Sequence, residues 1–340
     1  MRWCVAPACP RFVAAAVCGL SLLSACAPAA LPTAVPGAPD GPSSTAAAPP
    51  LPVGAPPRVP YVAGRWYVAP DRRLRLPGGR RGVTGAVVYD DGLLVADARI
   101  FEGTVGLARV RNGRWVASLG CSSGVPATSA DRRYVAWATT LCLESGDPTA
   151  GAIHRSRASG GGEVVVPVAA GLVSVVGFLG HDVVYQLGFA GGVWVSDLAG
   201  TPRRIPGIDH ARDTSTRRSL VLGGRGDRTD RVLRPDGTPL WRVAEGDLIG
   251  FSPAGGRVVA FRDDRLVVLR SRDGSTAATI DLPAEVEAWS VTWESERTLL
   301  ALEYDAGRVA VVRLHLDGRA ERATAWRAVD ASGGPYVLLP

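Results

Sequence analysis

The sequence predicts an all-β fold for residues 60–340, arranged as a β-propeller. Two observations support this prediction. Short runs of Val, Leu, Ile and aromatic residues are separated by Gly and Asp-Gly turns, which is typical of consecutive antiparallel strands. A tight-turn motif also recurs at intervals of roughly 37 to 49 residues, close to the length of one four-stranded propeller blade. We therefore expect a ring of four-stranded blades.

The recurring turn is the strongest local signal. Asn-Gly and Asp-Gly pairs favour tight hairpins, because these residues tolerate the positive φ angles that such turns need. Each copy of the motif therefore predicts a hairpin. The copies are Asn112-Gly113, residues 160–162, residues 197–200, Asp236-Gly237, Asp273-Gly274 and Asp317-Gly318.

A second element precedes each hairpin and consists of a turn followed by an apolar strand. Its clearest copy is Phe-Ser-Pro-Ala-Gly-Gly-Arg-Val-Val-Ala-Phe at residues 251–261. This copy resembles the Ser-Pro-Asp-Gly-Arg-x-Leu-Ala-Phe repeat of TolB-like and WD40-like β-propellers, with Ala254 in place of the usual Asp. The resemblance extends over about residues 60–340. It implies the fold and does not imply an activity.

The two ends of this region are expected to complete one blade together. Residues 65–76 form a hairpin that lacks two inner strands. Residues 326–329 and 336–339 can supply those strands, which would close the ring and leave no open sheet edge. Counting this shared blade gives seven four-stranded blades. Six or eight blades are the alternatives, because residues 156–166 and 209–219 are poorly patterned.

The first 25 residues have the features of a secretory signal. Two arginines, Arg2 and Arg11, precede an uncharged apolar stretch at residues 12–23 that is too short to span a bilayer comfortably. The stretch ends in Leu-Ser-Ala-Cys26, which resembles the lipobox of bacterial lipoproteins. This resemblance implies a signal peptide at residues 1–25, a lipid anchor on Cys26 and a place at the extracytoplasmic face of the cell membrane. The alternative is an ordinary signal peptide with an incidental cysteine.

Residues 26–59 are predicted to be a disordered tether between this anchor and the propeller. They consist mainly of Pro, Ala, Gly, Ser and Thr and cannot bury enough apolar surface to fold. A Pro-rich segment of this kind acts as a semi-extended spacer. No later window is apolar over the roughly 18 residues that a membrane span needs. The remainder of the chain is therefore expected outside the bilayer.

The charge of the chain does not predict nucleic-acid binding. All 38 basic residues are arginines and the formal net charge is +6. The arginines are interleaved with acids and do not form one basic block. Arg-rich loops could nevertheless contact anionic lipid headgroups near a membrane. The lack of Lys and the excess of Ala, Gly, Val and Pro resemble the composition of high-GC, actinobacterial proteins.

Two cysteines remain once the signal and the expected anchor are set aside. These are Cys121 and Cys142. In an oxidising compartment, two such thiols form a disulfide more often than a catalytic or metal-binding pair. We therefore expect a disulfide between Cys121 and Cys142.

No motif predicts catalysis, a metal site or a cofactor. Residues 120–124 match the G-x-S-x-G spelling, but no helix is predicted after them, as a nucleophile elbow requires. The four histidines are isolated and lack zinc-type spacing. The tryptophans of the repeats are interpreted as residues that pack between blades.

One polar group remains as a candidate ligand site on a rim of the ring. His181, Asp182, Asp209, His210 and Asp213 lie near the starts of blades, where loops gather. They could converge on a cation or a polar ligand. The alternative is that these side chains solvate loops and cap hairpins.

These features together favour a non-catalytic binding or scaffold lipoprotein of the cell envelope. Its partner would be an envelope protein or polymer. Two alternatives remain open. One is an enzyme that acts on glycans or a related polymer and uses acids, Arg or Tyr in the central funnel. The other is a sensor of a small ligand in the channel.

Overall fold

The computed structural model describes residues 50–77, 82–101, 104–140, 151–169, 172–188, 191–226, 229–243, 247–283, 286–329 and 335–339. The chain divides into two units, residues 1–49 and residues 50–340. The predicted signal peptide, Cys26 and most of the predicted tether lie outside the described residues. Throughout the ranges above, the chain forms β-strands and turns and no helix.

The strands form six hydrogen-bonded sheets. The sheet that contains both ends of the folded unit has the order β29 (Tyr336–Leu338), β1 (Tyr61–Ala63), β2 (Trp66–Ala69) and β3 (Arg72–Arg75). The longest sheet has the order β11 (Val164–Val168), β10 (Gly151–Arg157), β9 (Tyr134–Thr140), β7 (Arg114–Ser122), β6 (Thr104–Arg111), β5 (Gly92–Phe101) and β4 (Val83–Tyr89), and β8 (Ala127–Thr128) also pairs with β9.

The remaining four sheets follow chain order. The first comprises β12 (Val173–Leu179), β13 (Asp182–Leu187), β14 (Val193–Ser196) and β15 (Arg203–Ile205). The second comprises β16 (His210–Ser215), β17 (Leu220–Gly224), β18 (Asp230–Leu233) and β19 (Pro239–Val243). The third comprises β20 (Asp247–Phe251), β21 (Arg257–Arg262), β22 (Arg265–Arg270) and β23 (Thr276–Asp281). The last comprises β24 (Val286–Ser295), β25 (Thr298–Asp305), β26 (Arg308–His315) and β27 (Ala320–Arg322), and β28 (Arg327–Ala328) also pairs with β26.

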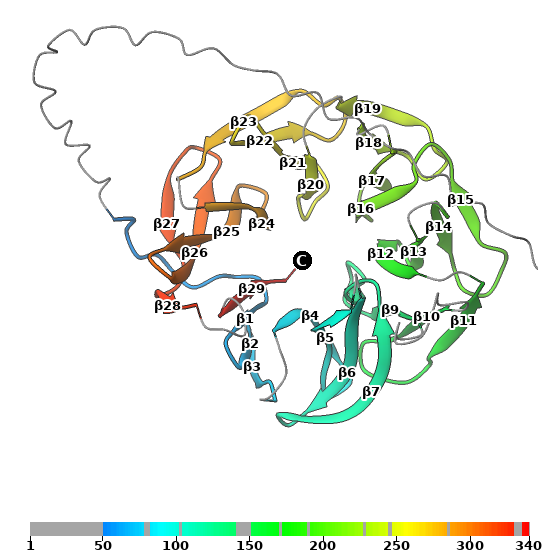
Figure 1. The fold of residues 1–340 in the computed structure, drawn as a ribbon. Coiled ribbons are helices and arrows are strands. Elements are labelled where there is room, and N and C mark those ends of the chain that lie inside the picture. The colour runs from blue at the N-terminus through cyan, green and yellow to red at the C-terminus, as the bar shows by residue number, and fades with distance from the viewer. Residues whose placement is uncertain are drawn as a thin grey trace, which may run out of the picture. The chain divides into compact units, whose positions relative to one another are not determined.

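The sheets are arranged radially around a common axis, which makes the folded unit an all-β propeller (Figure 1). Five sheets are separate blades of four or five strands, and the sixth is a continuous sheet of eight strands. The prediction of seven four-stranded blades is therefore wrong. The register pair Cys121 with Thr140 joins β7 to β9 and merges strands that the sequence assigned to different blades.

The pairing of the two ends of the folded unit is observed. Tyr61 of β1 lies opposite Leu338 of β29, and Ala63 lies opposite Tyr336. The assignment of residues 326–329 to the same blade is wrong, because β28 pairs with β26 of the preceding sheet. In the sheet that contains β1, β2 and β3, the inner edge strand is β29, and it is the strand of this sheet that comes from the C-terminal region.

Apolar side chains pack between neighbouring sheets and form the core. Val268 and Ile280 of one blade, for example, pack against Val291, Leu299 and Val312 of the next. The tryptophans that the sequence assigned to packing lie in such clusters or against them. They are Trp115, Trp137, Trp194, Trp241 and Trp293.

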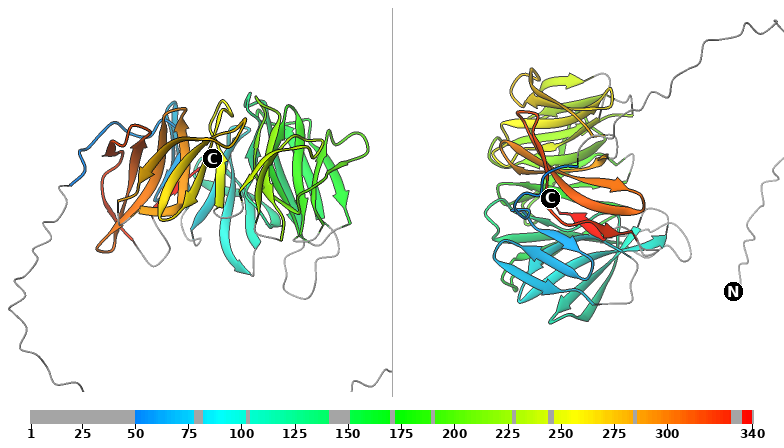
Figure 2. Two further views of the ribbon diagram at one scale, coloured as in Figure 1. Left: turned by 90° about the horizontal axis from the view of Figure 1, so that it is seen from above. Right: turned by 90° about the vertical axis from the view of Figure 1, so that its left-hand side faces the viewer.

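The inner strands of neighbouring blades run in the same direction between two ends of the ring, which are seen side-on in Figure 2. The Ala211 N–H, near the start of β16, donates to Oε1 of Gln186 (3.0 Å). Gln186 of β13 lies opposite Ser174, near the start of β12. The first residues of β12 and β16 therefore lie at the same end of the ring. The Thr216 hydroxyl donates to the Phe178 carbonyl (2.8 Å), so the two strands also end together. We call the end that holds the β12–β13, β16–β17 and β20–β21 turns the turn end. The opposite end, where β16 and β20 begin, is the loop end.

The first described residues join the ring at the turn end. Val53 bridges Arg322 in parallel with β27, a strand that begins just after the turn at residues 317–319. Leu51 packs against a cluster that also contacts Leu316. The segment 50–58 therefore runs along the last blade before it reaches β1.

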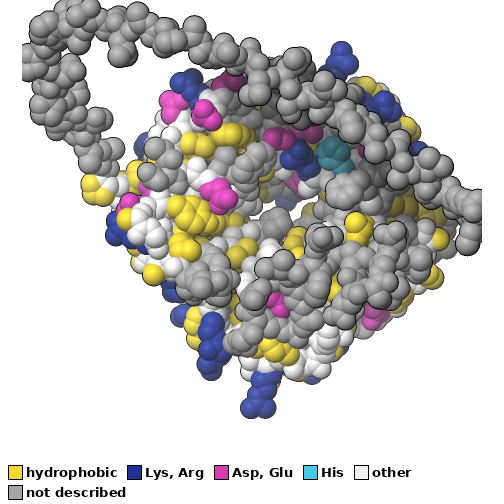
Figure 3. All heavy atoms as spheres, viewed as in Figure 1, with side chains coloured by type: hydrophobic (Ala, Val, Ile, Leu, Met, Phe, Trp, Pro, Cys, Tyr) yellow, Lys and Arg dark blue, Asp and Glu magenta, His cyan; other side chains and the backbone are white. Residues whose placement is uncertain are grey.

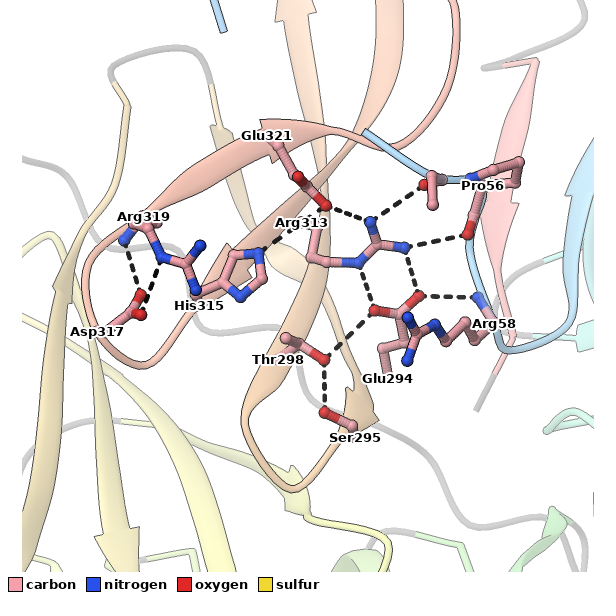
Figure 4. A network of polar contacts seen from close by, with 11 residues as sticks. Pro56, Arg58, Glu294, Ser295, Thr298, Arg313, His315, Asp317, Arg319 and Glu321 are labelled. Atoms are coloured by element: carbon pink, nitrogen blue, oxygen red, sulfur yellow. Dashed lines mark hydrogen bonds and ion pairs between the residues drawn. The ribbon is translucent and has the colours of Figure 1, made fainter. Parts of the chain in front are cut away.

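A buried ion network holds this segment in place (Figure 4). Arg313 and Glu294 form a two-pronged pair, Nε to Oε2 at 2.5 Å and Nη2 to Oε1 at 2.7 Å, and their side chains are 5% and 2% exposed. Arg313 also donates to the carbonyls of Ala55 and Pro56, each at 3.1 Å. The Arg58 N–H donates to Glu294 (2.8 Å). One guanidinium thus joins the segment to the last blade.

Candidate functional site

A group of charged side chains surrounds the mouth of the central channel at the loop end. Arg212 of β16 pairs with Asp247 of β20, Nη2 to Oδ1 at 2.7 Å, and its Nε lies 3.8 Å from Oδ2 of Asp230. Nε2 of His210 lies 4.0 Å from Oδ1 of Asp230. We call His210, Arg212, Asp230 and Asp247 the mouth cluster. Figure 3 shows histidine, acidic and basic side chains together on the rim of the central hollow, where Figure 1 places β16 to β20.

Local backbone features bring these side chains together. The register between β16 and β17 shifts between Ala211 and Asp213, which leaves Arg212 outside the regular pairing. Gly224 lies opposite both His210 and Asp230. A Cβ atom at Gly224 would lie 2.7 Å from Oδ1 of Asp230 and 2.8 Å from Cε1 of His210. The approach of the imidazole to the carboxylate therefore requires glycine at this position.

The electrostatics of the mouth cluster centre on Asp230. Its side chain is 6% exposed, and Oδ2 accepts the Leu248 N–H at 2.8 Å. Burial raises the pKa of Asp230, although the Leu248 N–H and Arg212 oppose this effect. One arginine faces two carboxylates, so the cluster carries one excess negative charge when His210 is neutral. It can accept a cationic or hydrogen-bond-donating group at the channel mouth.

Asp213 follows Arg212 in β16 and has a different role. Its Oδ2 accepts the Phe251 N–H and its Oδ1 accepts the Thr214 N–H, both at 2.7 Å. Burial raises the pKa of Asp213 to about 6, against the effect of these two donors. The bond to Phe251 joins β16 to β20. Asp213 therefore stabilises the contact between two blades.

The structure places four of the five residues predicted as a rim site at two opposite ends of the ring, and the fifth, Asp213, lies within β16. Asp209 and His210 lie at the loop end, where the Asp209 N–H donates to the Gly224 carbonyl (2.9 Å). His181 and Asp182 lie at the turn end, His181 in the turn between β12 and β13 and Asp182 at the first position of β13. There Nε2 of His181 lies 3.3 Å from Oδ2 of Asp131. Because inner strands are parallel, residues before β16 and residues after β12 cannot meet.

Sequence reasoning missed three members of the mouth cluster, namely Arg212, Asp230 and Asp247. A signal for them was present. Asp230 begins β18, the third strand of its sheet, and Asp247 begins β20, the inner strand of the next sheet. The first and third strands of an antiparallel blade begin at the same end of the ring, so the two acids could have been grouped.

The other predicted site residues lie partly outside the described residues. Cys26 and Cys142 both do. Cys121 is described, is 4% exposed and lies opposite Thr140, two positions before Cys142 in the chain. The predicted disulfide and lipid anchor stay predictions.

In the described part of the chain, no group of three or more His, Cys, Asp or Glu side chains is arranged to hold a metal ion. In the same residues, no helix is long and apolar enough to cross a membrane.

Comparison with known proteins shows the fold alone. No family model matches the chain, and no curated protein matches it. A similar solved structure comes from a structural and mechanistic analysis of two prolyl endopeptidases, with 13% identity and a TM-score of 0.55. The match covers 78% of this chain and 47% of that one, so the chain spans about half the length of this relative.

Two further solved structures have TM-scores below 0.5. The WD40 β-propeller domain of Doa1 has 13% identity and a TM-score of 0.46, and the match covers 80% of this chain and 87% of that one. BamB from Moraxella catarrhalis has 13% identity and a TM-score of 0.42, and the match covers 76% of this chain and 92% of that one.

Proposed function

We propose that this protein is a lipid-anchored, extracytoplasmic β-propeller that binds an envelope protein or polymer and does not catalyse a reaction. The observation that carries the proposal is the mouth cluster. It presents an excess negative charge at the loop end, at the opposite end of the ring from the point where residues 50–58 join it. Propeller loops at such a face form a broad binding surface.

The contacts of the cluster favour binding over acid–base chemistry. Asp230 is covered and accepts a backbone N–H, and Asp247 is held by Arg212 at 2.7 Å. A glycan-acting enzyme needs one carboxylic acid and one carboxylate free to reach the substrate. Here both carboxylates already contact other groups of the same chain. The site therefore fits the binding of a group from another molecule, which would replace solvent at Asp247 and His210, better than it fits glycan hydrolysis.

The lipobox resemblance and the path of segment 50–58 support the anchored arrangement. Leu51 and Val53 lie at the turn end, beside β27. An anchor on Cys26 with a semi-extended spacer would hold the turn end toward the membrane and leave the loop end open. The partner is therefore expected to approach the loop end.

The test is site-specific photo-crosslinking in intact cells with the full chain. A crosslinking residue at Arg225, which is exposed at the loop end, should capture a partner, and one at Arg114, which is exposed at the turn end, should not. Asp247→Asn should weaken the captured band. The matched control is Asp281→Asn, an exposed acid on an outer strand that pairs with Arg265. Equal capture from both ends, or none above a control that carries only residues 1–59, would contradict the proposal.

A further inference from the structure

Two hollows adjoin at the turn end and are lined by arginines. Their volumes are about 360 and 390 Å³. The first lies among the β16–β17, β20–β21 and β22–β23 turns, and the second extends to the β24–β25 and β26–β27 turns. Arg257 and Arg270 line both, so the two hollows adjoin, and together we call them the arginine hollow.

The arginine hollow has a large excess of positive charge. Three carboxylates accompany its arginines, namely Glu296, Asp317 and Asp273, and each is paired with one of them. Three positive charges remain in excess. The arginines are Arg218, Arg257, Arg270, Arg272, Arg297 and Arg319.

Three of these guanidinium groups have donors to spare. Among the described residues, the side chains of Arg218 and Arg297 have no hydrogen-bond or ion-pair partner, and both residues are exposed. Arg270 bonds only to neutral oxygens, the Ser275 hydroxyl at 3.1 Å and the Thr276 carbonyl at 3.2 Å. Positive charges gathered in this way repel one another unless an anion joins them.

The β20–β21 turn lines the first hollow and is fixed by the side chain of Glu296. Glu296 accepts the Ala254 N–H (2.6 Å) and the Ser252 hydroxyl (2.9 Å) from the neighbouring blade, which fixes the β20–β21 turn. Gly256 follows in this turn. A Cβ atom at Gly256 would have its closest contacts at 3.8 Å, to Glu296, and 3.9 Å, to Arg218. A side chain fits there and would project into the hollow.

We propose that the arginine hollow is a binding site for a ligand that carries two or more phosphate groups. Guanidinium forks match phosphate oxygens in pairs, and several forks around one cavity favour a dianionic group over a single carboxylate. The two adjoining parts of the hollow suit phosphates on one ligand. The inference is independent of the mouth cluster, which lies at the other end of the ring.

Two sources could supply this chemistry, a soluble polyphosphorylated compound or the headgroups of anionic lipids. Titration calorimetry of the full chain with inorganic tripolyphosphate tests the first source. Flotation with vesicles of cardiolipin, a lipid whose headgroup carries two phosphates, in phosphatidylcholine tests the second, with the Cys26→Ser chain so that no acyl anchor contributes. Citrate serves as a carboxylate probe of similar charge.

The variants separate the hollow from general surface charge. Arg218→Ala with Arg297→Ala should weaken binding at least ten-fold, because charge-assisted bonds are lost from both parts. Arg114→Ala with Arg132→Ala removes the same charge from exposed positions at the turn end but outside the hollow, and it should change binding less than two-fold. Gly256→Asp should weaken binding, whereas Gly256→Asn, which has nearly the same shape, should not.

Each outcome decides the proposal. Tripolyphosphate binding that these variants reduce supports the proposal and identifies a soluble ligand. Binding to cardiolipin vesicles that the same variants reduce supports the proposal and identifies lipid headgroups. The proposal is overturned if the wild-type chain binds neither probe, if citrate binds as tightly as tripolyphosphate, or if the Arg114 and Arg132 pair weakens binding as much as the hollow pair.

Discussion

The buried pair of Arg313 and Glu294 allows a quantitative test of how the first described segment is held. In Arg313→Leu, Glu294 would keep its buried position, at 2% exposure, without its counter-charge. Removing one partner of such a pair costs about 3–5 kcal/mol of unfolding free energy. At roughly 2 °C per kcal/mol for a unit of this size, the melting temperature should fall by about 6–10 °C. Urea and thermal denaturation monitored by circular dichroism measure both quantities.

Two further variants decide whether the buried charge is the cause. Arg313→Leu combined with Glu294→Leu should recover part of the lost stability, because the buried Glu294 charge is then no longer left without its partner, and Glu321, the other acid that pairs with Arg313, is 30% exposed. Arg319→Leu removes an arginine of the same blade whose side chain is 73% exposed, and it should leave the melting temperature unchanged. If Arg313→Leu melts within 2 °C of the wild type, or if the double variant is as unstable as the sum of the single ones, the reasoning is refuted.

Three other predictions concern single residues. Burial raises the pKa of Asp213 to about 6, so its contribution to stability is complete below the unfolded pKa of 3.8 and is lost as the pH rises through 6. The melting temperature of Asp213→Asn relative to wild type should therefore increase between pH 4 and pH 7, and a constant difference would contradict the assignment. If a disulfide joins Cys121 and Cys142, Cys121→Ser should lower the free energy of unfolding by about 2–4 kcal/mol under non-reducing conditions. In the presence of a reductant, the variant and the wild type should have the same free energy of unfolding. Cys26→Ser should move the protein from the membrane fraction to the soluble fraction, and unchanged sedimentation would rule out the anchor.

A pH effect of opposite sign is expected from Glu294. Burial opposes its ionisation, but hydrogen bonds from Arg313 and the Arg58 N–H hold the pKa of Glu294 below its usual value. Its contribution to stability is therefore present above pH 4.5 and is lost as the pH falls through the lower folded value. When the stability of Arg313→Leu is measured at decreasing pH, the loss of stability due to Glu294 should be absent. If the variant and the wild type lose stability over the same acid pH range, Glu294 does not make this contribution.

Local turn chemistry was readable from the sequence. Asn112 and Gly113 have φ angles of 51° and 72°, and Gly237, Gly274 and Gly318 have φ angles between 70° and 88°. All lie in hairpins, as predicted. These turns depend on residues that are adjacent in the chain, so the sequence carries their signal directly.

The number of blades and the make-up of the sites depend on contacts between distant residues, which the sequence did not reveal. One register pair, Cys121 with Thr140, merges eight strands into one sheet. The direction of the inner strands decides that His181 and His210 lie at opposite ends of the ring. The arginine hollow is likewise invisible in the chain, because its arginines come from turns of three successive sheets.

The pairing of β1 with β29 has a consequence for biogenesis. Tyr61 is synthesised long before its partner Leu338. Until that residue has left the ribosome, the first hairpin exposes an unpaired edge that can recruit another copy of the chain. The ring can therefore be sealed only after Leu338 has been synthesised. A nascent chain that stalls before residue 335 would be prone to association with its neighbours.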